Sequence, residues 1–211
     1  VYMAINIVTG TLAVAAKWLI LGRTKPGRYP LWGSTYFRWW LVGRLLTLVH
    51  VKWLQGSPAM AIYLRLLGAK IGRDAVIADA HIGAADLVTI GAGAVVGTKV
   101  EFANAEIIGN EFVIGTIAIG ENAVVGTSCV VGAGVTVGAD AELRDLTTVP
   151  ENTTVGAAEI WDGSPGRRIG TVDVAALPER ADASAGRRIL LGTVYALLLL
   201  VMPAVSLLPI F

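Results

Sequence analysis

The sequence predicts a parallel β-helix of short strands, flanked by helices that lie in or on a membrane. Two observations support this prediction. Aliphatic residues recur at every sixth position through the middle of the chain, and the next residue is usually Gly. The chain is also 55% hydrophobic over 211 residues, with a mean hydropathy of +0.66. Because that value is far above the value of an ordinary soluble domain, the apolar excess indicates membrane segments.

The six-residue repeat fits neither the 3.6-residue period of a helix nor the simple alternation of a strand. We interpret each hexad as a short strand and a corner, with the aliphatic residue and the small residue four positions later facing inward. Gly, Asn or Asp near the corner tolerates a left-handed backbone. Three sides close one triangular coil, and coils stack about 4.8 Å apart, which predicts roughly four to five coils. The aliphatic positions are Ile71, Ile77, Ile90, Val96, Phe102, Ile108, Ile114, Ile119, Val125, Val131, Val137, Leu143, Val149 and Val155.

Two apolar segments flank the repeat. Residues 1–22 carry one charge, at Lys17, and residues 189–211 carry none. Each is long enough to cross a bilayer as a helix, so we predict two transmembrane helices; a signal peptide, the alternative for the first, would need a basic start and a cleavage site. Basic residues lie at the repeat-facing ends of both segments, including Arg23 and Arg187. The positive-inside tendency then predicts an integral cell-membrane protein whose β-helix is cytoplasmic. Because the chain begins and ends inside predicted membrane segments, we expect it to belong to a longer polypeptide.

Three further segments complete the predicted organisation. Residues 23–70 combine Trp, aliphatic and basic residues, which is typical of amphipathic helices at a membrane interface; the alternative is a helix packed on the first coil. The end of this segment should cap the open end of the β-helix, which spans residues 71–168. A polar linker follows at residues 169–188.

Charge is divided unevenly along the chain. Residues 71–160 contain twelve acids and three bases, a net charge of −9, whereas the flanks contain fourteen bases and four acids, a net charge of +10. The acids form either a solvated surface or a field that concentrates a cationic substrate. The basic flanks border apolar segments and carry no nucleic-acid motif, so they indicate membrane lipid as the partner and no nucleic acid.

The repeat and the tail at residues 163–168, Gly-Ser-Pro-Gly-Arg-Arg, resemble the hexapeptide-repeat acyltransferase family, with Gly166 where Ala is usual. The resemblance implies a left-handed parallel β-helix. It also implies acyl transfer in which one His acts as general base on an attacking hydroxyl or amine. Inert members of this architecture exist, so the fold alone does not establish an activity.

His81 is the candidate general base implied by this resemblance. It lies where the count of six breaks between Ile77 and Ile90, and Asp79 or Asp86 could orient its imidazole. The alternative is a structural or surface histidine. Two His in the chain cannot supply the three-His site of the related γ-type carbonic anhydrases, so we predict no metal.

A second break affects the inward positions. Glu106 falls on a nominally inward position, which indicates that the frame shifts or a loop protrudes between Phe102 and Ile108. Loops leaving the coil carry the acceptor site in the family, so Glu101, Asn104 and Glu106 are candidate acceptor-binding residues. Cys129 falls on an inward small position and is predicted to be a packed thiol.

The tail supplies candidates for a cofactor. Gly163, Ser164, Arg167 and Arg168 could contact a carrier-bound phosphopantetheine arm or coenzyme A, with Arg supplying phosphate contacts. The alternative is a turn that ends the β-helix, with both Arg on acidic edges of the coils.

The order of parts also resembles the membrane-embedded C-terminal region of ε-poly-L-lysine-synthetase-type non-ribosomal peptide synthetases. That resemblance implies preceding adenylation and carrier domains and neighbouring β-helix copies that form a trimer or pseudo-trimer around a cationic amine substrate. In this chain the segment 99–104 lacks the His that the family pattern has there. The matching stretches are Pro26–Gly33, Arg38–Trp40, Gln55–Pro58, Tyr63–Gly72 and Asp86–Gly91.

Together these features favour an enzyme that joins an amine acceptor to a carrier-bound aminoacyl thioester through an amide bond. Two alternatives stay open. One is a membrane O- or N-acetyltransferase that uses acetyl-CoA on a glycan, and the other is an inert β-helix scaffold.

Overall fold

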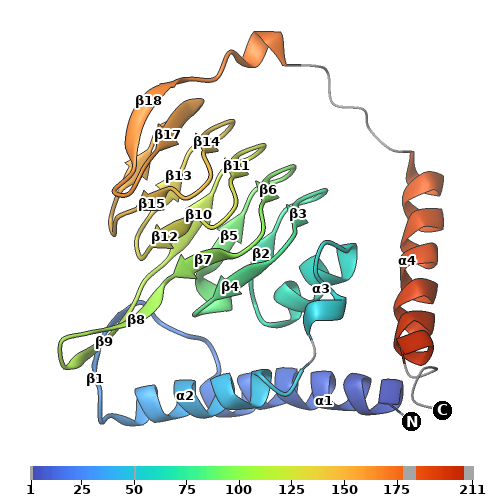
Figure 1. The fold of residues 1–211 in the computed structure, drawn as a ribbon. Coiled ribbons are helices and arrows are strands. Elements are labelled where there is room, and N and C mark those ends of the chain that lie inside the picture. Colours follow the sequence, from blue (N-terminus) through green and yellow to red (C-terminus); the bar gives the residue numbers. More distant parts are fainter. Residues whose placement is uncertain (1, 50, 178–183, 207–211) are drawn as a thin grey trace.

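The computed structural model describes residues 2–49, 51–177 and 184–206. Its centre is a stack of short parallel strands, seen edge-on in Figure 1. In this part of the chain the strands form three faces of a prism, with four complete coils and part of a fifth, as the repeat predicted.

Each face collects one strand from successive coils. The first face contains β2 (Lys70–Ile71), β5 (Val88–Ile90), β10 (Ile117–Ile119), β13 (Thr136–Val137) and β16 (Thr154–Val155). The second contains β3 (Val76–Ile77), β6 (Val95–Val96), β11 (Val124–Val125), β14 (Glu142–Leu143) and β17 (Glu159–Asp162), and β18 (Arg167–Thr171) returns antiparallel to β17. The third contains β4 (Ala80–Ile82), β7 (Val100–Ala103), β12 (Val130–Gly132) and β15 (Thr148–Val149).

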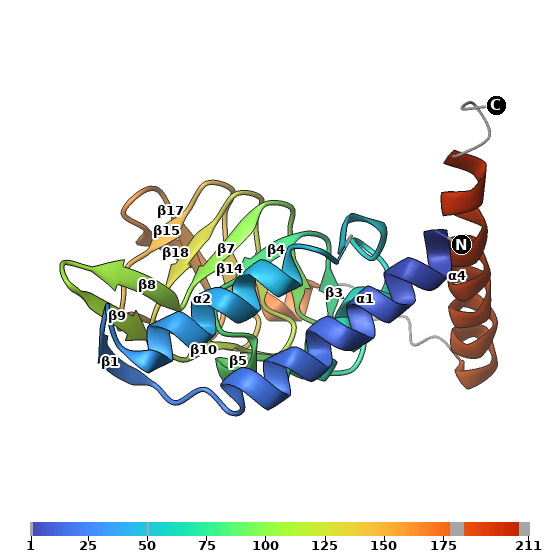
Figure 2. The same ribbon diagram turned by 90° about the horizontal axis from the view of Figure 1, so that it is seen from below.

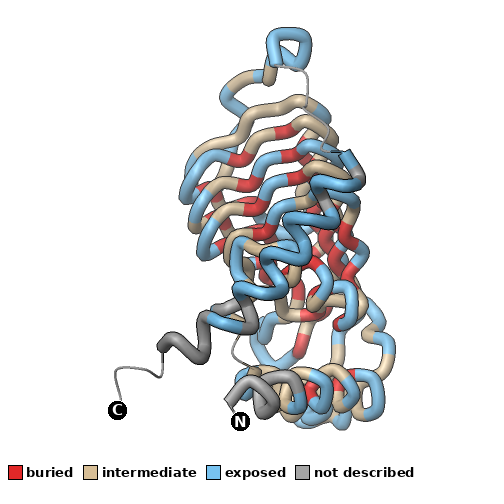
Figure 3. Tube along the Cα trace, turned by 90° about the vertical axis from the view of Figure 1, so that its right-hand side faces the viewer, coloured by how far each residue is buried: buried red, intermediate tan, exposed pale blue. Residues whose placement is uncertain are grey.

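The inside of the prism is filled by the residues that the repeat predicted. Aliphatic positions such as Val96, Val131 and Leu143 are fully buried, and so are the small residues Ala94 and Ala123. Buried residues recur in register from coil to coil (Figure 3). Every coil therefore contributes to one continuous core.

The Gly residues after the aliphatic positions are required by close packing between coils. A Cβ atom on Gly91 would lie 2.5 Å from the backbone nitrogen of Glu121, and one on Gly120 would lie 2.5 Å from that of Ala139. The corner positions with a left-handed backbone are mostly not Gly. Several of them are Asn or Asp, such as Asp74, as the repeat predicted. Non-Gly residues with positive φ are Asp74, Lys99, Asn122, Ser128, Asp140, Leu146, Asn152 and Ala158.

A hairpin interrupts the repeat after β7. Strands β8 (Ala105–Ile108) and β9 (Glu111–Ile114) pair antiparallel, and β9 also pairs with β1 (Gly27–Pro30), so the hairpin projects from the stack (Figure 1). Ile108, which we predicted to face inward, is 40% exposed because it lies on this hairpin. The protruding loop inferred from Glu106 is confirmed.

Helices cover one end and one side of the prism. Helix α1 (Tyr2–Ala16) continues into the π-helical turn η1 (Lys17–Leu21) and lies beside α2 (Ser34–Leu46) across the bottom of the molecule in Figure 1. Helix α3 (Pro58–Leu66) packs on β2 and β3, with Met60 and Leu64 in the main core, so the predicted cap is confirmed. The remaining helices are the 3-10 turns η2 (Val51–Trp53), η3 (Ala85–Leu87) and η4 (Val174–Ala176), and α4 (Ala185–Ser206).

Among the residues that the structure describes, no helix has both the length and the apolar run needed to cross a bilayer. The transmembrane helices predicted at the two ends are therefore not found in this part of the chain. The predicted segment 1–22 instead changes helix type at Lys17, which is buried. The predicted segment 189–211 coincides with α4 as far as Ser206, and residues 207–211 lie outside those described.

Candidate functional site

The third face of the prism brings His81 beside a carboxylate. Parallel register aligns His81 on β4 with Glu101 on β7, and both side chains are exposed. Their strand neighbours Ile82 and Phe102 pack inward. Because side chains alternate along a strand, His81 and Glu101 point outward from adjacent strands, roughly 5 Å apart at Cβ.

The projecting hairpin adds a second carboxylate to this region. Burial raises the pKa of Glu106 on β8, and the neighbouring carboxylates of Glu101 and Glu151 raise it further. Three acids therefore share one edge of the third face. Glu151 was not among the predicted site residues. It follows β15 on the third face, and the backbone N–H of the next residue, Asn152, donates to the Ala133 carbonyl at 2.8 Å.

Asn104 is buried at the neck of the hairpin. Its side chain accepts a hydrogen bond from the backbone N–H of Ala84 at 2.9 Å and donates to the carbonyls of Ala84 at 2.9 Å and Gly115 at 3.2 Å. Since its amide is used in this way, Asn104 fixes where the hairpin leaves the coil and does not present a free group to an acceptor.

The two Asp residues predicted to orient His81 have other partners. Asp79 accepts a hydrogen bond from Gln55 Nε2 at 2.7 Å. Asp86 forms an ion pair with Lys17 at 3.2 Å and accepts from the backbone N–H of Thr24 at 2.6 Å. Within the described part of the chain, no hydrogen bond or ion pair joins His81 to either residue. Glu101 is the carboxylate that strand register places next to the imidazole.

The Lys17–Asp86 pair fastens the N-terminal helices to the first coil. Both side chains are more than nine-tenths buried, with 4% and 7% exposed. Lys17 Nζ also donates to the carbonyl of Gly22 at 3.0 Å and lies 3.7 Å from the centre of the Trp18 ring. Asp86 is therefore a structural anchor in this geometry.

The tail after the last coil reaches the far end of the third face. Ser164 Oγ donates to Thr148 Oγ1 at 2.9 Å, and the Gly166 N–H donates to the Thr148 carbonyl at 2.7 Å. Thr148 stands in register with Val130 and hence with Glu101 and His81. Three strand spacings, about 14 Å, separate the His81 and Thr148 rows. The third face thus joins the predicted base and the predicted cofactor turn.

The two Arg residues of the tail have different surroundings. Arg168 pairs with Glu159 at 3.2 Å, as the structural alternative expected. Arg167 is exposed on β18, opposite Asp162. Gly163 offers its carbonyl to the Thr148 N–H at 3.0 Å, so it closes the turn.

Cys129 is a packed thiol, as predicted. It is fully buried, and its Sγ donates to the Arg144 carbonyl at 2.9 Å. Burial raises the pKa of this thiol, which keeps it protonated and unreactive near neutral pH.

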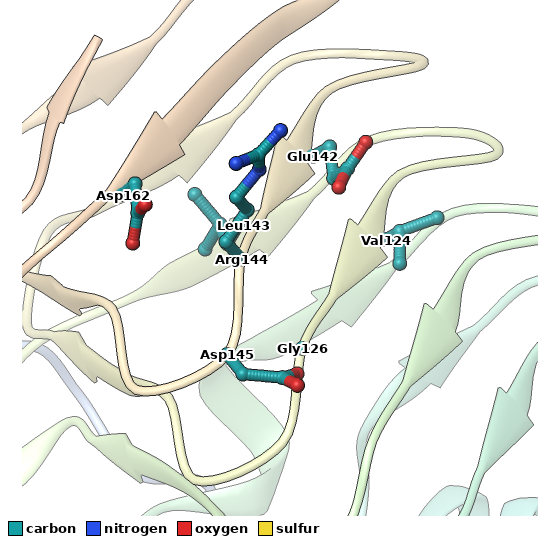
Figure 4. Close-up of a pocket in the computed structure, with 7 residues that line it drawn as sticks. All are labelled: Val124, Gly126, Glu142, Leu143, Arg144, Asp145 and Asp162. Carbon is teal, nitrogen blue, oxygen red and sulfur yellow. The ribbon is translucent and has the colours of Figure 1, made fainter. Parts of the chain in front are cut away.

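A shallow pocket opens on the second face, away from these residues (Figure 4). Arg144 points outward there with the carboxylates of Glu142 and Asp162 on either side, and Asp145 accepts from the Thr127 N–H at 2.7 Å. None of the predicted site residues lines this pocket. Nor does the described part of the chain place three His, Cys, Asp or Glu side chains together for a metal ion.

Comparison with known proteins gives one informative sequence relative. No family model matches the chain. It is 36% identical, over an alignment of 212 positions that covers 100% of the chain, to the delta-poly-L-ornithine synthetase of Acinetobacter baumannii (strain AB307-0294). The chain spans only 16% of that relative's length.

Among solved structures, a galactoside acetyltransferase in complex with coenzyme A matches with a TM-score of 0.52 and 15% identity, covering 75% of this chain and 95% of that one. This likeness supports the β-helix fold that the strand order of the chain shows. A hexapeptide-repeat-containing acetyltransferase from Vibrio cholerae matches with a TM-score of 0.47 and 15% identity, covering 80% of this chain and 93% of that one.

Proposed function

We propose that this chain is an acyltransferase-like domain of a membrane-bound non-ribosomal peptide synthetase. It would form amide bonds between an amine acceptor and an aminoacyl thioester held on a carrier domain. The observation that supports this most strongly is the 36% identity, along the entire chain, to a poly-ornithine synthetase. By this proposal, adenylation and carrier domains and neighbouring β-helix copies belong to the same polypeptide.

The third face offers groups for each part of this reaction. The acceptor nitrogen attacks the thioester carbonyl carbon, the C–N bond forms and the C–S bond breaks. His81 takes the proton from the attacking amine and returns it to the departing thiolate, so the step is balanced without an oxidant or a metal. Glu101 lies on the adjacent strand, where its charge stabilises the imidazolium formed in between.

The acidic edge fits a cationic acceptor. Burial raises the pKa of Glu106, and the carboxylates of Glu101 and Glu151 are close enough to raise it further. Glu101 also lies beside His81. An ammonium group held there would be next to the base that must deprotonate it before attack.

Phosphopantetheine or coenzyme A would supply the thiol that carries the acyl group. Among the tail residues, Arg167 is exposed and suits a phosphate, whereas Arg168 already pairs with Glu159. Ser164 lies at the same end of the third face through its bond to Thr148. We therefore propose that Arg167 and Ser164 contact the phosphopantetheine or coenzyme A at one end of the third face, and that acyl transfer takes place at His81 at the other end.

The proposal is tested with His81→Ala in the intact protein, and Thr89→Ala is the matched control because Thr89 is exposed on the first face of the next coil. Loss of the base should slow amide formation by about 10²–10⁴-fold while carrier loading stays unchanged. Thr89→Ala should leave both unchanged. Amide product is measured by mass spectrometry, and freed carrier thiol is measured colorimetrically. Normal product formation by folded His81→Ala would remove His81 from the mechanism.

A membrane O- or N-acetyltransferase is the second candidate, favoured by the structural likeness to a galactoside acetyltransferase in complex with coenzyme A. The acyl donor that the protein uses distinguishes this candidate from the synthetase. Acetyl transfer from acetyl-CoA to a glycan, without turnover of the aminoacyl carrier, would support this candidate and contradict the synthetase.

An inert scaffold is the third candidate, favoured by the structural contacts of Asp79, Asp86 and Asn104. It predicts normal product from both the His81→Ala and the Glu106→Gln proteins. It also predicts that deletion of the whole β-helix, but no single outward substitution, stops synthesis.

We also place the protein in the cell membrane with the β-helix on the cytoplasmic side. Arg187, next to the last apolar segment, supports this orientation. Protease protection in sealed inverted vesicles tests it, because the coils should be cleaved there and protected in right-side-out vesicles.

A further inference from the structure

Helices α1 and α2 form a flat layer beneath the prism. Seen from below, they cross the molecule as two adjacent rods (Figure 2). We call the outward side of α1, η1, the turn at Trp32, and α2 the floor. The opposite side of these helices packs on the first coil through Lys17 and on the hairpin through Tyr36 and Trp39. Helix α1 also contacts α4.

Helix α1 presents an apolar stripe on the floor. Val8 is 54% exposed, Leu12 62% and Leu19 86%. Steps of four and seven residues place Val8, Leu12 and Leu19 on one side of a helix. Ala13 and Lys17 are buried on the other side, where Lys17 meets Asp86.

Helix α2 also has one side packed on the molecule and one exposed apolar side. Tyr36 and Trp39 pack against Phe112 of the hairpin, with ring centres 5.3 and 4.7 Å away. Phe37 is 60% exposed and Trp40 41%, and their rings stack on each other at 6.3 Å. Three exposed aromatic side chains thus lie along the floor: Trp32 (92% exposed), Phe37 and Trp40. Trp18 faces the other way, because its Nε1–H donates to the Leu66 carbonyl at 2.8 Å.

The charge of this region has a single sign. The first acid in the chain is Asp74, and ten bases precede it: Lys17, Arg23, Lys25, Arg28, Arg38, Arg44, Lys52, Arg65, Lys70 and Arg73. Some are used internally, since Arg28 pairs with Glu111 and Arg65 donates to backbone carbonyls. Arg38 and Arg44, on α2, are exposed beside the floor aromatics, and Arg44 lies 5.7 Å from the Trp40 ring.

We propose that the floor lies on an anionic lipid bilayer, with α1 and α2 parallel to the membrane plane. Exposed Trp, Phe and Leu enter the boundary between headgroups and acyl chains, and Arg pairs with lipid phosphates. A patch this apolar is unusual on a free surface. A surface that binds another protein is expected to carry charges of both signs at its rim, whereas the exposed charged residues beside the floor aromatics, Arg38 and Arg44, are both cations. The inference is independent of the proposed reaction.

The placement also orients the site. The hairpin bearing Glu106 rests on β1 and on α2 through Phe112, so it is tied to the floor. The third face therefore stands directly above the membrane surface, at a height set by the hairpin.

The test is the depth of spin labels in the intact protein, in vesicles of 30% phosphatidylglycerol and 70% phosphatidylcholine. Cys129→Ala removes the buried thiol, and single Cys substitutions are then made at Val8, Leu12, Leu19 and Phe37. Collision with oxygen and with a water-soluble nickel complex reports depth. All four labels should lie at one shallow depth, about 5–10 Å below the phosphates. A label at Thr98, exposed on the coils, should be aqueous.

A spanning helix gives a different result. Eleven residues separate Val8 from Leu19, so their depths would differ by about 16 Å. That gradient would overturn the proposal. Aqueous labels would exclude the membrane from the floor, and labels shielded from both collision partners would show that a protein covers it.

A charge-reversal pair tests the lipid headgroup. Arg38→Glu with Arg44→Glu should reduce the membrane-embedded fraction of the Phe37 label by roughly tenfold or more in anionic vesicles. Lys99→Glu with Arg144→Glu makes the same charge change on the exposed coils and should have no effect. Equal behaviour of the two pairs would contradict the role assigned to the floor cations.

Discussion

At the residue scale, the Lys17–Asp86 pair shows how one contact decides between interpretations. Sequence reasoning placed Lys17 near the end of a membrane span and Asp86 beside a catalytic His. The structure buries both together, and Gly68 must be Gly because its Cβ would lie 2.7 Å from that of Asp86. Neither residue signals this partner locally, since 69 positions separate them in the sequence.

Breaking this pair should destabilise the protein. Asp86→Asn leaves Lys17 charged and buried without its partner, and Lys17→Met does the same to Asp86. Each substitution should lower the free energy of unfolding by about 3–5 kcal/mol. The double substitution leaves no buried charge and should recover most of the loss. Chemical denaturation measures the cycle, with Glu121→Gln as an exposed control expected to change stability by about 0.5 kcal/mol or less. Additive single effects would show that the pair is not coupled.

At the element scale, two antiparallel hairpins modify an otherwise parallel stack. The β8–β9 hairpin carries Glu106 toward Glu101, and Asn104 fixes its neck. The β17–β18 hairpin closes the last coil. There Glu159 accepts hydrogen bonds from the Trp161 Nε1–H at 2.9 Å and the Gly156 N–H at 2.8 Å and pairs with Arg168.

The terminal hairpin should show a defined pH dependence. The bond from Trp161, then that from Gly156, and finally Arg168 lower the pKa of Glu159 below its ordinary value. A lowered carboxyl pKa adds stability that is complete above the unfolded-state pKa and is lost as pH falls through the folded-state pKa. Glu159→Gln should therefore unfold at lower denaturant concentration than wild type at pH 7.

The difference should shrink toward zero as pH falls below the lowered pKa. Denaturation midpoints of the two proteins from pH 7 to pH 3 give the comparison. Glu142→Gln, on the neighbouring strand β14, is the control and should leave the pH profile unchanged. A Glu159→Gln deficit that is constant with pH would mean that packing, not charge, stabilises the hairpin.

At the scale of the whole molecule, the β-helix is a one-dimensional stack whose ends need protection. Helix α3 covers the first coil, and the β17–β18 hairpin covers the last. Charge is also separated, with an acidic stack above a basic, apolar floor.

Loss of the α3 cap should therefore affect the entire stack. Leu64 is 3% exposed and contributes to the continuous core, so Leu64→Ala should cost about 2–5 kcal/mol. Ile62, on the same helix, is 55% exposed, and Ile62→Ala should cost about 0.5 kcal/mol or less. Thermal unfolding measures both, and size-exclusion chromatography checks for end-to-end association of Leu64→Ala. Equal effects of the two substitutions would show that α3 does not cap the core.

The sequence alone determined the stack, its inward residues other than Ile108, and the break in the repeat near Glu106. These depend on local rules: a six-residue period imposes inward and outward positions coil after coil, and Glu106 at an inward position signals a break. Cys129 and Leu143 could be placed inside the prism in this way, because each hexad repeats the same environment.

Only the tertiary structure decided which polar groups meet. The partners of Asp86, Asn104 and Thr148 come from other coils or from the N-terminal helices, and no short-range pattern encodes such distances. The same holds for α1. Its composition suits a span or a surface helix equally well, and the buried contact of Lys17 with the first coil is what lays it beside α2. Local periodicity defines an element, but the balance of contacts on its two sides defines where it lies.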